Sequence, residues 1–224
     1  EVMHQFKDIL KENPLKVHKK VRHKKRKSPA KRTVVMHLSD THFQSKIDPE
    51  ELGNLNCFSE IEEARRLAYF CREVADYKPH YRKDTELVIA CNGDIGQGII
   101  HDIESTVPMT TQFAAMMHLM TQAITYLSGH YHSVRVVCTG GNHLRFMHKQ
   151  NKGRQTQEKW DSFATMLYVG LDYALKNHDN VSLEIPTTPY AYMDIQGHKF
   201  FITHGDTIIT VGNVGKVIST ENIK

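Results

Sequence analysis

The chain has 224 residues, of which 40% are hydrophobic and 24% are charged, and its mean hydropathy is −0.47. This composition is typical of a globular chain that is long enough to bury one sizeable core. No apolar run approaches the roughly 18–20 residues that a membrane-spanning helix needs. The sequence therefore excludes a membrane-spanning protein and predicts one main domain.

The net charge of +4 conceals a separation of charge along the chain. A short helix is expected over residues 1–15, and residues 16–32 then hold ten lysines and arginines and no acid. The rest of the chain has 19 basic and 25 acidic residues. Such basic runs commonly bind polyanions, although the same composition also suits a linker or a targeting signal. We predict a mildly acidic domain that carries a basic arm.

Beyond the arm, strand-like apolar segments alternate with amphipathic segments at helical spacing. Helices are predicted over residues 59–77, 110–127 and 158–176, the last with Trp160 in its buried stripe. The strands are predicted at residues 33–39, 87–91, 134–138, 181–185, 190–195 and 199–203. This alternation predicts an α/β domain in which helices cross over between parallel strands.

Four of the predicted strands end in Asp, Asn or His side chains, beside glycine or in an alternating pair. The ligand site of such a sheet lies beyond the carboxyl ends of its strands, so these side chains are expected to converge. Carboxylate, imidazole and amide groups together suit Mn, Fe or Zn better than Ca or Mg alone. Each motif alone is commonly a turn, but the ordered set predicts a metal centre. The motifs are Asp40-Thr41-His42, Asn92-Gly93-Asp94, Gly140-Gly141-Asn142-His143 and His204-Gly205-Asp206.

Over residues 33–209 these motifs resemble, in their order, those of the calcineurin-like metallophosphoesterase superfamily. The resemblance implies a β-sandwich flanked by helices and a centre of two divalent metal ions, with Mn²⁺ favoured over Mg²⁺, Fe²⁺ or Zn²⁺. It implies that Asp40 and His42 bind the first metal, that Asp94 bridges both, and that Asn142 and His204 bind the second. His143 is expected beside the scissile phosphate, as a transition-state stabiliser or general acid, so that His143 and Asp94 carry the catalysis.

The sequence departs from the family pattern at three points. No second Asp follows Asp94 within the glycine-rich stretch, and Leu144 follows His143, which disfavours the protein-phosphatase branch. The family closes with Gly-His-x-His, but no histidine follows His204. Because a two-metal site that lacks a ligand binds poorly, we expect an excerpt whose metallophosphoesterase domain, residues 33–224, is incomplete at its C-terminus.

Positive charge near the predicted site indicates the substrate. Basic side chains of the loop after His143 and of the arm are predicted to contact nucleic-acid phosphates, although a solvated loop accounts for the former equally well. Neither region interleaves aromatic residues, so stacking on single strands is not indicated. The residues are Arg145, Lys149, Lys152 and Arg154 in the loop, and Lys24, Lys25, Arg26 and Lys27 in the arm.

The function expected from this sequence is that of a metal-dependent phosphoesterase, namely a DNA nuclease of the break-repair or phage type. The alternatives are a non-catalytic DNA-binding or assembly module, and a phosphatase or phosphodiesterase for small or protein substrates. The four cysteines form no Cys-x-x-Cys pair and the chain opens without a signal-peptide pattern, so a cytoplasmic protein is expected. The sequence leaves the oligomeric state open.

Overall fold

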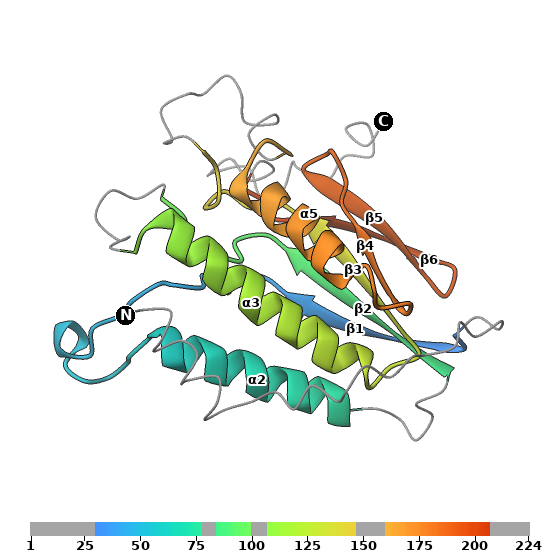
Figure 1. Ribbon diagram of the computed structural model, residues 1–224, viewed down its shortest axis with the longest axis horizontal. Coiled ribbons are helices and arrows are strands. Elements are labelled where there is room, and N and C mark those ends of the chain that lie inside the picture. The colour runs from blue at the N-terminus through green and yellow to red at the C-terminus, as the bar shows by residue number, and fades with distance from the viewer. Residues whose placement is uncertain (1–29, 78–83, 100–106, 147–159, 207–224) are drawn as a thin grey trace, which may run out of the picture.

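Four parallel strands in chain order form the central sheet (Figure 1). The computed structural model describes residues 30–77, 84–99, 107–146 and 160–206. Each strand pairs with the next one along the chain, so that Leu38 lies beside Cys91 and Cys91 beside Cys138. The strands are β1 (Arg32–Leu38), β2 (Thr85–Asn92), β3 (Ser133–Thr139) and β4 (Val181–Glu184).

Three helices connect these strands and cover one face of the sheet: α2 (Glu60–Asp76), α3 (Met109–Ser128) and α5 (Phe163–Leu175). Crossovers between parallel strands are right-handed, so a sheet whose strands follow chain order places every crossover helix on the same face. The predicted α/β domain with parallel strands is therefore confirmed. Among the described helices, none combines the length and the apolar character needed to cross a membrane.

A β-hairpin packs against the opposite face of the sheet. It consists of β5 (Tyr190–Ile195) and β6 (His198–Thr203), which pair antiparallel and lie beside the sheet in Figure 1. The guanidinium of Arg135 on β3 fixes the hairpin, because it pairs with Glu86 and Glu184 on the sheet and donates to the Asp194 carbonyl at 3.0 Å. Within the described residues, the second layer of the expected sandwich consists of these two strands.

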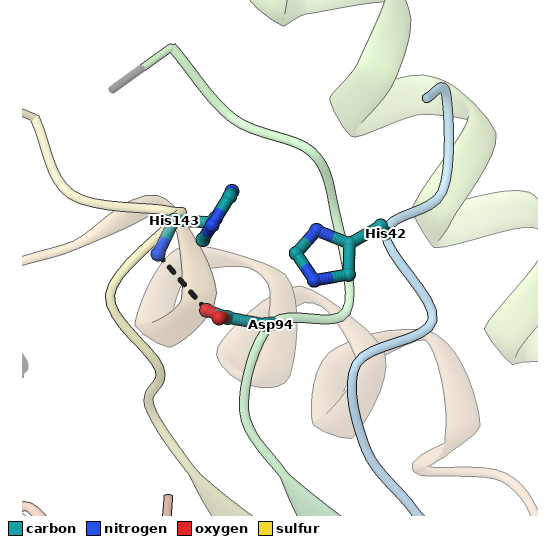
Figure 2. Close-up of side chains that lie close together, drawn as sticks. All are labelled: His42, Asp94 and His143. Carbon is teal, nitrogen blue, oxygen red and sulfur yellow. Dashed lines mark hydrogen bonds between the residues drawn. The ribbon is translucent and has the colours of Figure 1, made fainter. Parts of the chain in front are cut away.

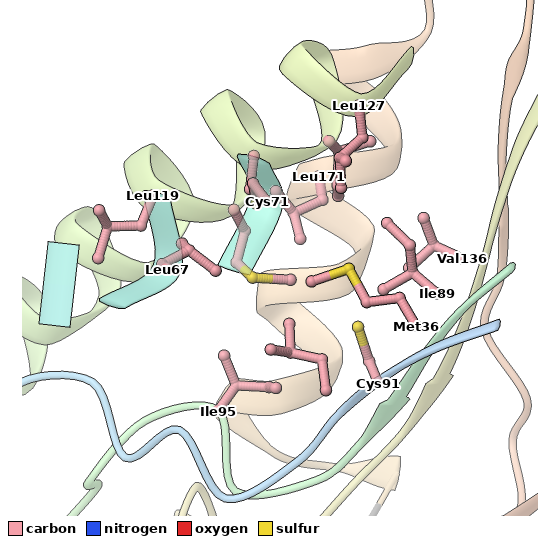
Figure 3. Close-up of a cluster of buried hydrophobic side chains, with 14 of the residues drawn as sticks. Met36, Leu67, Cys71, Ile89, Cys91, Ile95, Leu119, Leu127, Val136 and Leu171 are labelled. Carbon is pink, nitrogen blue, oxygen red and sulfur yellow. The ribbon is translucent and has the colours of Figure 1, made fainter. Parts of the chain in front are cut away.

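The core follows the two-residue period of the strands. Met36, Ile89 and Val136 face the helices and join the larger core, whose side chains interlock with those of α2, α3 and α5 (Figure 3). The intervening residues Val88 and Val137 face the hairpin and join a second, smaller core.

Two element boundaries differ from the sequence prediction. Helix α5 begins at Phe163, because the Ser162 side chain accepts a hydrogen bond from the Thr165 N–H at 3.3 Å and caps the helix there. Trp160 precedes this cap and is 40% exposed, so its predicted place in the buried stripe of the helix is wrong. Strand β1 begins at Arg32, which the prediction assigned to the basic arm. The expected helix over residues 1–15 and the arm up to residue 29 lie outside the described residues.

A buried carboxyl group joins α2 to the loop that follows β1, which also contains the short 3₁₀ helix η1 (Glu50–Leu52). Glu63 is 1% exposed, and its two oxygens accept hydrogen bonds from the N–H and the side-chain amide of Gln44, at 2.6 and 2.7 Å. Burial raises the pKa of Glu63 to about 7, although the hydrogen bonds from Gln44 act in the opposite direction. The ionised form is therefore costly to keep in the folded chain.

Glu63 predicts a pH dependence of stability. Because its pKa is raised in the folded state from 4.5 to about 7, its contribution is fully present below pH 4.5 and is lost as the pH rises through 7. That shift corresponds to a fall of about 3 kcal/mol in the free energy of unfolding. Urea unfolding between pH 4.5 and 7.5 should show a fall that is smaller by about this amount in Glu63→Gln than in the wild type. The exposed control Glu73→Gln should retain the wild-type fall, and an unchanged pH dependence in Glu63→Gln would contradict the assignment.

Candidate metal centre

The loops after β1, β2, β3 and β6 bring the predicted motifs together at the carboxyl edge of the sheet. Figure 2 shows His42, Asp94 and His143 approaching one another from three of these loops. Two groups of three side chains each have ligand atoms within 4.8 Å of one another: His42, Asp94 and His143, and Asp40, Asp94 and His204. Asp94 is common to both groups, which is the position that a bridging ligand occupies.

The Asp94 carboxylate is buried and fully engaged. It is 4% exposed, its Oδ1 accepts from the His143 N–H at 2.9 Å, and its Oδ2 lies 2.9 Å from His204 Nε2. Burial acts to raise the pKa of Asp94, but the hydrogen bonds from His204 and His143 outweigh it and lower the pKa below its ordinary value. The side chain is thus held as an anion, the form that binds a cation.

His204 presents its ring to two oxygen atoms. Its Nδ1 donates to the Asn92 carbonyl at 2.9 Å, while its Nε2 faces Asp94 and also lies 3.2 Å from Asn142 Oδ1. The hydrogen bond to Asp94 raises the pKa of His204 to about 9. A proton on His204 Nε2 therefore supplies the positive charge that faces the Asp94 and Asn142 oxygens. Metal ligation needs the neutral ring, so a cation bound there would take the place of that proton.

Gln97, which was not among the predicted site residues, holds both of the remaining histidines. Its side-chain oxygen lies 3.1 Å from His42 Nδ1, and its carbonyl oxygen lies 2.9 Å from His143 Nδ1. The two imidazole rings are 4.4 Å apart and nearly perpendicular, at 84°. Burial, and then the neighbouring His143, lower the pKa of His42, which favours the neutral ring that binds metals. The only sequence signal for Gln97 is a polar residue inside a glycine-rich turn.

The loop after β1 has an unusual backbone. Asp40, His42 and Gln44 have φ values of 53°, 44° and 71°, and Asp94 in the facing loop has φ 50°. Left-handed backbone is uncommon in residues other than glycine. Residues 40–42 therefore do not continue the extended backbone of β1, although Asp40 Oδ1 and His42 Nε2 come within 3.9 Å. The His42 N–H donates to the Asp94 carbonyl at 3.1 Å, which joins the two loops.

Arg145 braces the loop after β3. Its Nε donates to the Asn142 carbonyl at 2.8 Å, its side chain is 13% exposed, and the guanidinium lies 4.0 Å from Asp206. These contacts position Asn142, and a phosphate contact by Arg145 stays a prediction. The other predicted phosphate-binding residues lie outside the described part of the chain, namely Lys149, Lys152 and Arg154 of the loop and Lys24, Lys25, Arg26 and Lys27 of the arm.

The two groups of side chains could each hold a metal ion. Asp40 and Asp94 supply carboxylates, His42 and His204 supply imidazoles, and Asn142 supplies an amide oxygen beside His204. This mixture suits Mn, Fe or Zn, and Gln97 and the Asn92 carbonyl fix the rings from outside the donor set, as at many metal sites. Neither a protein-family model nor a curated protein matches this chain. The geometry of the site therefore carries the functional interpretation.

Gly141 is predicted to be indispensable for the geometry of this centre. A Cβ atom at this position would lie 2.0 Å from Asp94 Oδ1 and 2.5 Å from the Asp94 nitrogen, so alanine must displace the shared carboxylate. Gly141→Ala should weaken Mn²⁺ binding, measured by isothermal titration calorimetry, by at least the 10- to 100-fold typical of disturbed outer-shell contacts. The control Gly129→Ala, whose Cβ would meet only the Tyr126 carbonyl at 3.3 Å, should bind Mn²⁺ like the wild type. Wild-type affinity in Gly141→Ala would refute the assignment of Asp94.

Proposed function

We propose that this chain is a metal-dependent phosphoesterase of the metallophosphoesterase type that hydrolyses phosphodiester bonds in DNA. The observation that carries the proposal is the sharing of the buried, ionised Asp94 between two groups of metal-binding side chains. A carboxylate in that position holds two cations beside each other, which is the arrangement used for in-line displacement at phosphorus. The order of the four motifs along the chain supports the same reading.

Each residue of the centre has a role in this proposal. The sequence motifs assign Asp40 and His42 to one cation and Asn142 and His204 to the other, with Asp94 between them. The ligand atoms themselves group Asp40 with His204 and His42 with His143, so His204 would lie within reach of either partner set. Two divalent ions, with Mn²⁺ favoured, neutralise the anionic diester and lower the pKa of the attacking water when they are bound. Gln97 keeps the rings of His42 and His143 in place through Nδ1, and Asn92 does the same for His204.

His143 is proposed as the general acid. Its Nδ1 is directed at the Gln97 carbonyl, so its Nε2 is the nitrogen that can donate a proton to the departing oxygen. Its backbone N–H donates to Asp94, which ties the position of the ring to the shared carboxylate. His143 also belongs to one of the two groups of candidate ligands, and the following experiment separates the two roles.

Substitutions of Asp94 and His143 should have different consequences. Asp94→Asn removes the shared charge and should abolish both tight Mn²⁺ binding and Mn²⁺-dependent hydrolysis. His143→Asn should retain Mn²⁺ binding but slow hydrolysis by about 10²–10⁴-fold, the usual contribution of a general acid. Calorimetry with Mn²⁺ and a diesterase assay on the same preparations measure both effects. If His143→Asn loses metal in parallel with activity, His143 is a ligand and not the acid.

DNA is the proposed substrate because of the charge distribution. The arm carries ten basic residues and no acid, whereas the rest of the chain is mildly acidic. A basic segment of this kind supplies sequence-independent attraction to a polyanion, and that attraction weakens as the salt concentration rises, because release of the condensed counterions then becomes less favourable. The acidic remainder includes the carboxylates of the proposed centre.

The substrate and the arm are tested together. Linear and plasmid DNA should be degraded with Mn²⁺ and preserved with EDTA, and cleavage of p-nitrophenyl phosphate alone would refute the nuclease. Replacing Lys24, Lys25, Arg26 and Lys27 with Gln should lower the slope of log binding constant against log salt by about 0.9 for each lost phosphate contact. Replacing the exposed residues Arg72 on α2 and Lys176 at the C-cap of α5 should leave that slope unchanged. An unchanged slope in the arm variant would remove the arm from DNA binding.

A further inference from the structure

A pocket of about 300 Å³ lies beside the candidate metal centre. It is formed where the end of β1 and the following loop face residues 63–70 of α2. Asp40 belongs both to its lining and to one of the two groups of candidate ligands, so the pocket adjoins the centre. The lining residues used below are Asp40, Phe58, Glu63, Arg66 and Phe70.

Aromatic and apolar side chains line this pocket together with several polar ones. Phe58 is half-buried, and Phe70 is 37% exposed. The guanidinium of Arg66 lies over the Phe58 ring at 5.3 Å, and Glu62 holds it there by accepting from Nε at 2.8 Å. Apolar and aromatic walls with a few fixed polar groups are typical of sites for small ligands, and this volume is at the small end of their range.

Glu63 is the only carboxylate that α2 contributes to the lining, and it is already hydrogen-bonded within the protein. Both oxygens of Glu63 accept hydrogen bonds from Gln44, so this side chain does not direct a polar contact at one particular ligand edge. The rings of Phe58 and Phe70 and the planar guanidinium of Arg66 remain as contact surfaces. Such surfaces stack on the face of a planar ring and tolerate different edges.

We propose that this pocket binds the nucleobase of the nucleotide next to the scissile phosphodiester. This inference rests on the proposed function and names the substrate feature recognised beside the metals. The volume accommodates a single ring system and not a duplex, so the base must be unpaired before it enters.

Two diesters with the same leaving group test the pocket: thymidine 5′-(p-nitrophenyl phosphate) and methyl p-nitrophenyl phosphate. The measured quantity is the ratio of their kcat/KM values with Mn²⁺. The wild type should prefer the thymidine diester by about tenfold or more, and Phe70→Ala and Arg66→Ala should each lower that ratio by at least about fivefold, as lost stacking does. Phe70→Leu, which retains the apolar volume, covers the case in which Phe70→Ala fails to fold.

Two neighbours on α2 supply matched controls. Tyr69 is 59% exposed and does not line the pocket. Arg65 pairs with the same Glu62 as Arg66 but, unlike Arg66, does not line the pocket. Tyr69→Ala and Arg65→Ala should keep the wild-type ratio. A ratio that the pocket variants leave unchanged, or that the control variants lower equally, overturns the proposal.

Binding measurements separate this inference from the proposed function. If neither diester is hydrolysed, the phosphoesterase assignment fails while the pocket remains testable by calorimetry with thymidine 5′-monophosphate and deoxyribose 5-phosphate. The wild type should bind the nucleotide at least about fivefold more tightly, and Phe70→Leu should abolish that difference. Equal affinity of the wild type for the two compounds overturns the base pocket.

Discussion

The buried carboxylate of Asp94 is the constraint on which the arrangement of the strand ends depends. Burying an anion is costly unless hydrogen-bond donors or a positive charge compensate it. For Asp94, the His143 N–H and the His204 ring, from two other loops, provide that compensation. Gly141 permits the close approach, since no side chain fits between it and Asp94. The loop after β3 and the end of β6 must therefore keep their places around β2 for Asp94 to stay ionised. The same requirement for positive charge is what two divalent cations would satisfy.

The central sheet was predictable because strand and crossover helix alternate with clear apolar periods, and parallel strands then deliver their motifs to one edge. The start of α5 was not predictable in this way. The helical spacing of apolar residues extends back to Trp160, but helix α5 begins only after the cap at Ser162. Apolar spacing alone does not show at which residue a helix begins. Glu63 illustrates the same limit, because a buried carboxyl on a helix looks like an exposed one in sequence until its partner Gln44 is placed beside it.

Within the site, the residue types were predictable and the backbone was not. Asp40, His42, Asp94, Asn142, His143 and His204 come together at one edge of the sheet, but Asp40 groups with His204 and His42 with His143. The predicted pairing of Asp40 with His42 at one metal stays a prediction. The left-handed conformations at residues 40, 42 and 94 depend on hydrogen bonds between loops, such as that from the His42 N–H to the Asp94 carbonyl. Gln97 acts through one side-chain atom and one backbone atom, and no residue pattern encodes such a role.

The loop from Asp40 to Gln44 concentrates unfavourable backbone conformations beside the candidate metal centre. Four of the six non-glycine residues with positive φ in the described chain are in this loop or at Asp94, and each such conformation costs about 1–3 kcal/mol. Gln97 holds His42, and Glu63 holds Gln44 at the energetic cost of its own burial. Asp40 stands at the start of this loop, facing both the Asp94 group and the pocket. The contacts of Gln97 with His42 and of Glu63 with Gln44 hold this strained backbone in place, and with it the position of Asp40. Strained residues held by their surroundings are expected in a preorganised site more than in an ordinary turn.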